Sequence, residues 1–167
     1  MSSVFDKDTA DLFRKVTVRM DWIALAASNA RISRVRLSAQ DLDAVLVPWF
    51  VLDGVPVCDQ RHKAVPYFPN VHFRPPMRGD TTVTVGQAAA DGFTHPLLDA
   101  EDVRRKERLV GDELVLPVYD VRIGYMILDG NHRSIAARRT NRDVAVELVV
   151  IRGPIDGRVL PDLAVFE

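Results

Sequence analysis

The fold of this chain is decided by the stretch Tyr125-Met126-Ile127-Leu128-Asp129-Gly130-Asn131-His132-Arg133-Ser134-Ile135-Ala136-Ala137-Arg138-Arg139. Its apolar beginning, residues 125–128, predicts a buried strand, and Asp129-Gly130 predicts a turn. Residues 135–137 predict the apolar face of a helix. Such a turn directs the free N–H groups of the first helical turn, with the positive end of the helix dipole, at whatever lies beyond it. The stretch therefore predicts a binding site for an anion.

Two basic residues, His132 and Arg133, fall in the first turn of that helix. Cations at this end oppose the helix dipole, and a bound phosphate would balance them. The alternative is an ordinary helix start with two solvated basic side chains. Spacing alone supports both interpretations equally.

Composition sets the class of protein. The chain has 167 residues, 47% of them hydrophobic, and a net charge of −1, which fits one globular domain without a general affinity for nucleic acid. No segment approaches the roughly 18 to 20 apolar residues that span a bilayer, and the first residues show no signal-peptide pattern. Cys58 is the only cysteine, which excludes an internal disulfide. We expect a cytoplasmic protein that does not insert into membranes.

The first half of the chain predicts mixed local structure. Residues 1–30 have helix-like apolar spacing, and residues 32–37 alternate as a half-buried strand does. Six of the ten prolines fall between residues 48 and 76, so this segment predicts short strands, with a hairpin turn at Asp53-Gly54.

The second half is more regular. It predicts strands over residues 82–85, 114–121 and 144–151, a helix that starts at an acidic cap near Asp99, and a loose tail over residues 155–167. The helix after Gly130 is expected to end near Asn141, a residue that tolerates a left-handed conformation.

The order strand, turn, strand, DGNHR, helix, apolar strand over residues 114–151 resembles the ParB/sulfiredoxin-like superfamily. Members carry the pattern L-P-V…Y-x-I-x-D-G-x-H-R-x-x-A-A, matched here by residues 116–118 and 125–137. The resemblance implies an α+β fold, a mixed sheet with flanking helices. It places a core over residues 80–154, after an N-terminal extension over residues 1–79 and before a tail over residues 155–167.

Within that superfamily, several activities are implied. Sulfiredoxins carry a catalytic cysteine where this chain has Asn131, so sulfinic-acid repair is not expected. Partition proteins add a helix-turn-helix domain, which is not expected here. Free amino-acid kinases of this fold need a carboxylate base, for which position suggests Glu101, Asp120 or Asp129. Small plasmid-borne inhibitors of conjugal transfer match in size and motif, and they imply ATPase and DNase activity.

The residue types in the motif predict separate roles. Gly130 allows a phosphate to approach the backbone, and Arg133 can clamp its oxygens. His132 can donate a hydrogen bond or shuttle a proton, and Asn131 can orient a ligand or a water. Ser134 can add a further donor. Asp129 can hold Mg²⁺, although a turn-stabilising role is the commoner one for aspartate before glycine.

Three hypotheses about function follow. The first is a nucleotide-binding protein that takes ATP or CTP, with Mg²⁺, at residues 130–134 and hydrolyses it weakly. It would also have possible DNase activity, in plasmid transfer or partition. The second is a non-catalytic interaction protein, a fertility-inhibition type, with a vestigial phosphate site and a docking face over residues 48–76. DNA or a protein of the transfer or partition machine would be its partner. The third is a small-molecule kinase of the same fold.

Overall fold

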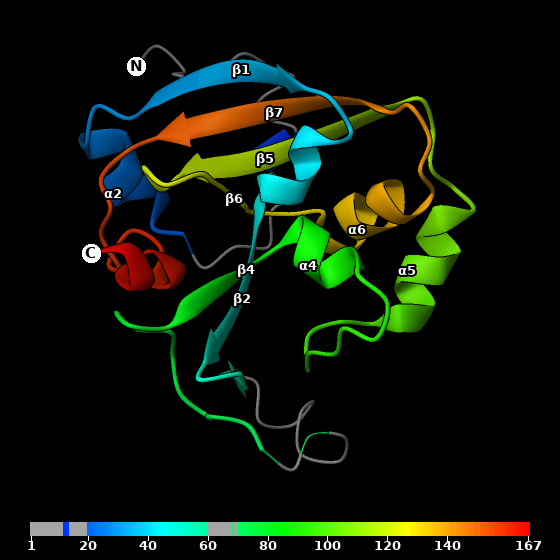
Figure 1. Cartoon of the computed structure of the whole chain (residues 1–167). Coiled ribbons are helices and arrows are strands. Elements are labelled where there is room, and N and C mark those ends of the chain that lie inside the picture. Colours follow the sequence, from blue (N-terminus) through cyan, green and yellow to red (C-terminus); the bar gives the residue numbers. More distant parts are fainter. Residues whose placement is uncertain (1–11, 14–19, 60–67, 69) are drawn as a thin grey trace.

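A mixed β-sheet runs through the molecule (Figure 1). The computed structural model describes residues 12–13, 20–59, 68 and 70–167, and within them seven strands pair in the order β1-β7-β5-β6-β2-β3, with β4 also on β2. The strands are β1 (Arg31–Leu37), β2 (Leu46–Leu52), β3 (Val55–Val57), β4 (Thr81–Thr84), β5 (Glu113–Asp120), β6 (Tyr125–Ile127) and β7 (Ala145–Arg152). The helices are α2 (Trp22–Ala27), α4 (Val85–Ala89), α5 (Ala100–Glu107) and α6 (Asn131–Arg139), with short 3₁₀ helices η1 (Asp41–Ala44) and η2 (Pro161–Phe166). The expected α+β class with a mixed sheet is confirmed.

Both halves of the chain build this sheet. β7 pairs with β1 antiparallel and with β5 parallel, while β6 joins β5 antiparallel to β2 parallel. Three strands from the first half, β1 to β3, therefore belong to the same sheet as β4 to β7. The boundary expected at residue 79, between an extension and a core, does not coincide with any division of the sheet.

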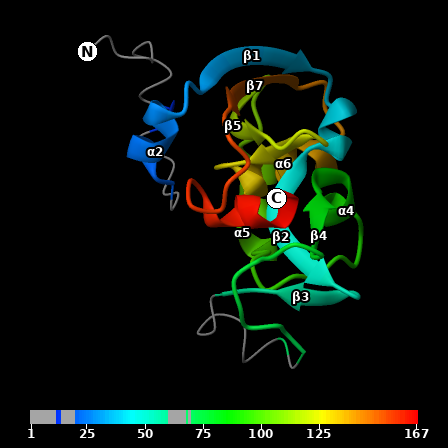
Figure 2. The same ribbon diagram turned by 90° about the vertical axis from the view of Figure 1, so that its left-hand side faces the viewer.

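The sheet has an apolar core on each face. Along β7, Val146, Leu148 and Val150 enter one core, whereas Val149 and Ile151 enter the other. Side chains of α4, α5 and α6 complete the first core, and side chains of α2 and η2 complete the second. The strands lie between α2 and α4 when the molecule is turned by 90° (Figure 2). Since successive residues of a strand face opposite ways, a strand buried on both sides must be apolar throughout, as β7 nearly is.

The end of the chain closes the second core. Residues 155–167, expected as a loose tail, contribute Val159, Leu160 and Leu163, all buried. The hydroxyl of Tyr119 on β5 donates to the carbonyl of Pro154 at 2.8 Å. Burial raises the pKa of Tyr119 to about 12. The spacing in this segment is too irregular to reveal its burial, because a 3₁₀ helix shows neither the period of an α-helix nor that of a strand.

Local signals give the turns and caps correctly. Asp53 and Gly54 both have positive φ, 51° and 79°, and join β2 to β3 in the expected hairpin. Asn141 follows α6 with φ 51°, as its residue type predicts. Asp99 caps α5 by accepting hydrogen bonds from the amides of residues 101 and 102.

Two expectations lie partly outside the described residues. Of the helical segment expected over residues 1–30, the structure describes residues 12–13 and 20–30, in which Phe13, Met20 and Leu25 are buried. Of the proline-rich segment, residues 60–67 and 69 fall outside. In the part of the chain that is described, no helix combines the length and apolar character needed to cross a bilayer.

Candidate functional site

The turn between β6 and α6 is shaped by one glycine. Gly130 has φ +98°, a left-handed conformation that side chains rarely adopt. A Cβ at this position would lie 2.8 Å from Cδ2 of Leu116 and 2.9 Å from Nη2 of Arg133. The backbone at Gly130 is therefore held against β5 on one side and a guanidinium on the other.

The helix that follows begins without a cap. Its first described intrahelical bond joins the amide of Ser134 to the carbonyl of Gly130 at 2.9 Å, and none of the described side chains caps the preceding amides. By contrast, α2, α4 and α5 begin with Asp21, Thr84 and Asp99, whose side chains accept from the first amides. The first N–H groups of α6 and the positive end of its dipole are therefore not capped by a side chain, an arrangement that suits an anion.

A further polar atom in this turn has no hydrogen-bond partner. Oδ1 of Asn131 is buried, and among the described residues it is unsatisfied. A buried amide oxygen without a partner costs about 1 to 3 kcal/mol. An oxygen accepts, so its complement is a donor such as a water, a hydroxyl or an amino group of a ligand rather than a bare phosphate oxygen.

Arg133 lies over the turn. Its Nη2 is 3.2 Å from Oδ2 of Asp129, and both side chains are 43% exposed. An exposed pair of this kind adds about 0 to 1 kcal/mol to stability. The guanidinium has five N–H donors, so most of them are available to a ligand while Asp129 holds the group in place.

His132 points away from the turn and into α5. Its Nδ1 lies 3.1 Å from Oδ2 of Asp102. Its Nε2 lies 3.2 Å from the amide nitrogen of Asp99 and 3.1 Å from the carbonyl oxygen of Leu97. The ring also packs at a tilt against buried Trp49, with centroids 5.8 Å apart. Both ring nitrogens expected to serve a ligand are therefore engaged with the protein.

Asp102 holds this histidine. Burial alone would raise the pKa of Asp102, but hydrogen bonds from Lys106 and Arg105 outweigh it and keep that pKa below its usual range. The carboxylate thus stays ionised opposite the His132 ring. Asp102 lies in the first turn of α5, three residues after its cap. The contact joins residues 30 positions apart, which no local pattern reveals.

Ser134 is also engaged within the helix. It is fully buried, its hydroxyl donates to the carbonyl of Asn131 at 2.7 Å, and its amide already bonds to Gly130. The predicted ligand residues thus divide into two sets. Gly130, Asn131 and Arg133, with Asp129, surround the open side of the turn, whereas His132 and Ser134 serve the fold.

The candidate carboxylate bases are spread apart. Asp120 pairs with Tyr125 across the β5–β6 ladder and binds Nε of Arg152 at 3.0 Å, at the end of β6 that is remote from the turn. Glu101 is exposed on α5. Only Asp129 lies in the turn itself. The described residues contain no group of three or more histidine, cysteine, aspartate or glutamate side chains that could hold a metal ion.

A pocket of about 260 Å³ lies beside Arg133. It is bounded by the end of α5, the start of β5 and the flank of α6. Most of its lining residues are apolar and three are charged. The lining consists of Lys106, Leu109, Val110, Gly111, Glu113, Leu114, Val115, Arg133, Ala137 and Val144. Because Arg133 belongs both to this pocket and to the turn, a ligand whose anionic end lies at α6 can place an apolar end here.

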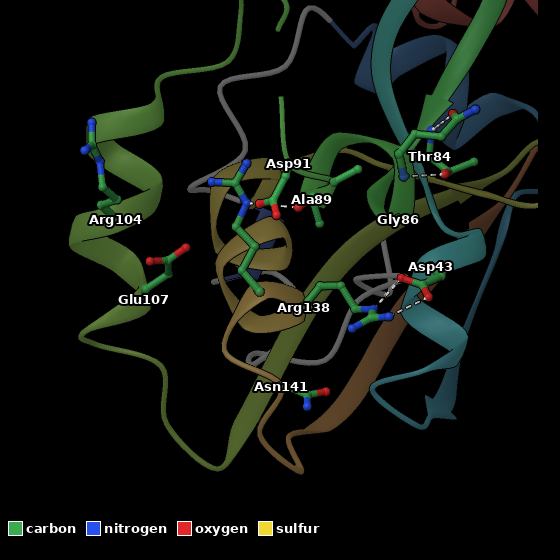
Figure 3. Close-up of a pocket in the computed structure, with 12 residues that line it drawn as sticks. Asp43, Thr84, Gly86, Ala89, Asp91, Arg104, Glu107, Arg138 and Asn141 are labelled. Carbon is green, nitrogen blue, oxygen red and sulfur yellow. Dashed lines mark hydrogen bonds and ion pairs between the residues drawn. The ribbon is translucent and has the colours of Figure 1, made fainter. Parts of the chain in front are cut away.

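A larger pocket, of about 770 Å³, lies at the other end of α6 (Figure 3). Arg138 reaches from α6 to Asp43 on η1, with Nε–Oδ1 2.5 Å and Nη2–Oδ2 3.0 Å. Arg139 donates from Nε to the carbonyl of Ala89 at 3.2 Å. Arg104 and Glu107 line the opposite wall on α5. The two arginines of α6 connect it to η1 and α4, so the pocket marks a junction of helices.

A second histidine, His95, packs against the same tryptophan as His132. His95 is 1% exposed and stacks on Trp49, with centroids 5.4 Å apart and planes at 8°. Burial lowers its pKa to about 4, against a hydrogen bond to the carbonyl of Phe50 that acts the other way. Trp49 of β2 thus contacts both His95, in the segment between α4 and α5, and His132 of α6.

No family model matches this chain, and neither a curated protein nor a solved structure is significantly similar to it.

Proposed function

We propose that this protein binds a nucleoside triphosphate such as ATP or CTP at the turn between β6 and α6. The observation that carries the proposal is the uncapped N-terminus of α6, which begins at a left-handed glycine with Arg133 beside it. Amide donors, a helix dipole and a guanidinium together complement the charge of a phosphate chain. Mg²⁺ would accompany the nucleotide through its phosphate oxygens, with Asp129 as the nearest carboxylate.

The pocket beside Arg133 supports a ligand with an apolar end. Its volume of about 260 Å³ lies just below the range of about 300 to 1,000 Å³ typical of small-molecule sites, which suits one part of a ligand rather than the whole. Placing the nucleoside there and the phosphates over Gly130 uses both features at once.

Hydrolysis at this site is expected to be slow. His132 and Ser134 are engaged with the protein, and the one carboxylate in the turn, Asp129, is paired with Arg133. A general base must be within hydrogen-bond reach of the attacking water and free to take its proton. These contacts also favour the second candidate function, a nucleotide-binding interaction protein without turnover.

The first experiment tests the phosphate site. Arg133→Ala should weaken binding of ATP or CTP at least about tenfold in calorimetric titrations with Mg²⁺, because it removes charge-assisted hydrogen bonds of about 1.5 to 3 kcal/mol. Its melting temperature should stay within a few degrees of wild type, since the pair with Asp129 is exposed. Arg108→Ala, on the exposed end of α5, is the matched control and should change neither quantity. Loss of stability with unchanged binding would refute the phosphate site.

A second experiment tests the pocket. A Cβ at Gly111 meets nothing within 4 Å, so Gly111→Phe can add a ring at the pocket without a clash at its root. We expect this variant to lose affinity for the nucleotide while keeping its affinity for inorganic triphosphate. Gly111→Ala should retain both. Equal loss for the two ligands would place the nucleoside elsewhere.

A further inference from the structure

The Nε2 atom of His132 faces both a donor and an acceptor. The amide nitrogen of Asp99 lies 3.2 Å from it and the carbonyl oxygen of Leu97 lies 3.1 Å from it. An amide N–H can only donate and a carbonyl can only accept. Nε2 therefore has a partner whether or not it carries a proton.

The two protonation states use different partners. In the neutral ring with its proton on Nδ1, that N–H donates to Asp102 and Nε2 accepts from the amide of Asp99. In the imidazolium, Nε2–H donates to Leu97 and the amide of Asp99 loses its acceptor. Each state gives the ring two hydrogen bonds, so gaining a proton exchanges one bond for another.

Charged groups of both signs face the ring from α5. Asp102 faces Nδ1 from α5, with Arg105 and Lys106 bound to the same carboxylate. Asp99 caps α5 through its own carboxylate. On the β2 side the ring meets uncharged Trp49, which separates it from His95.

On α6 itself, the neighbouring charges are the exposed pair Arg133–Asp129. This pair carries no net charge. An anion bound at the start of α6 would add a negative charge near the ring, and a nearby negative charge stabilises a protonated imidazole.

We infer that His132 is a proton switch that couples the turn before α6 to the N-terminus of α5. A proton from solvent enters at Nε2, the bond from the amide of Asp99 is released, and a bond to the carbonyl of Leu97 forms. Phosphate binding at α6 promotes this uptake, a part of the inference that rests on the proposed function. Histidine is suited to the role because it exchanges its proton near neutral pH.

The first test uses the free protein. Nitrogen NMR of the His132 ring should show the Nδ1–H tautomer at high pH and the imidazolium at low pH, with the Asp99 amide shifting at the same midpoint. Asp102→Asn, which removes the facing carboxylate, should move that midpoint down. Lys106→Gln, which removes a cation bound to Asp102, should move it up. An Nε2–H tautomer at high pH, or an Asp99 amide that does not follow the ring, would overturn the inference.

The second test adds inorganic triphosphate as the probe. Between pH 8 and pH 6 the wild-type affinity should rise about threefold more than that of His132→Gln, which keeps polar groups but cannot become charged. Because triphosphate itself titrates equally in both experiments, the difference between wild type and His132→Gln removes the contribution of the probe. Equal pH dependence of the two proteins would overturn the ligand coupling. Complete absence of binding to wild type would instead refute the proposed function, while the tautomer and amide measurements still decide the switch.

Discussion

At the scale of single residues, the backbone angle of Gly130 and the burial of His95 both shape the site. Gly130 has a φ that favours glycine, and the atoms around it leave no room for a side chain. His95 is an ionisable group held neutral in the core. The first allows the turn, and the second supports the Trp49 wall against which His132 rests.

Gly130→Ala should be destabilising. A left-handed conformation costs a side chain about 1 to 2 kcal/mol, and the contacts at 2.8 Å and 2.9 Å require Leu116 and Arg133 to move. We expect a fall of about 2 kcal/mol or more in the free energy of unfolding, measured by urea denaturation. Gly111→Ala, with open space and no positive φ, should be neutral or slightly stabilising. Equal effects at the two positions would mean that the turn is not constrained as described.

His95 should make stability depend on pH. The unfolded histidine has a pKa near 6.5 and the folded one near 4, so the unfolded chain binds more protons between these values. Stability is then complete above about pH 6.5 and decreases as pH falls towards 4, by at most roughly 3 kcal/mol. Denaturation midpoints at pH 7 and pH 5 measure this loss. His95→Gln should reduce the difference between the two midpoints, and an unchanged difference would contradict the buried neutral state.

At the scale of elements, side chains fix the approach to β4. Arg74 binds Asp80 with two hydrogen bonds of 2.7 Å and 2.6 Å, and the amide of Met77 donates to the same carboxylate at 2.9 Å. The hydrogen bonds from Arg74, above all, hold the pKa of Asp80 below its usual range. Three hydrogen bonds, two from Arg74 and one from the amide of Met77, thus hold residues 74–80 around one buried carboxylate.

Asp80→Asn should loosen this segment. The substitution keeps the size but removes the charge that binds Arg74, and we expect a loss of about 2 to 3 kcal/mol at pH 7. The loss should shrink below about pH 4, because there the unfolded wild-type chain takes up a proton at Asp80 before the folded chain does, and wild type loses this part of its stability. Asp53→Asn, exposed in the β2–β3 turn, should be nearly neutral. Chemical denaturation of both variants measures the free energy of unfolding, and equal losses for the two would contradict the role of Asp80 as a buried ion-pair partner.

At the scale of the whole molecule, the sheet joins distant parts of the chain. β1 lies at one end beside β7, and β2 lies between β6 and β4. The first half supplies Leu42, Val45, Val47 and Trp49 to one core and Phe50 to the other. The turn between β6 and α6, where we propose that a nucleotide binds, therefore rests on a core to which the first half of the chain contributes.

A fragment beginning at Gly79 should not fold. It would lack those five buried side chains, each worth about 1.5 to 3 kcal/mol, together close to the whole stability of a typical domain. It would also expose the edge of β7 that β1 covers. We expect its far-ultraviolet circular dichroism spectrum to be that of an unfolded chain, and we expect no cooperative unfolding transition on heating. A fragment beginning at Leu12, which keeps all the strands described, should fold, and a folded Gly79 fragment would make the first half an accessory.

The sequence by itself determined the features whose causes lie within a few residues. The hairpin at Asp53-Gly54, the cap at Asp99 and the turn at Gly130 all follow from preferences of one or two side chains. The apolar run of β7 likewise predicted a strand buried on both faces. These agree with the structure because backbone angles and first-turn hydrogen bonds are local.

Only the tertiary structure decided which elements meet. The motif placed His132 beside a ligand, but the packing of α5 against α6 engages both of its ring nitrogens with residues 97–102. It also brought β1 to β7 and buried the last turn of the chain at Leu163. Pairing between distant segments is selected by the fit of whole apolar faces, a property of the complete sheet that no short stretch contains.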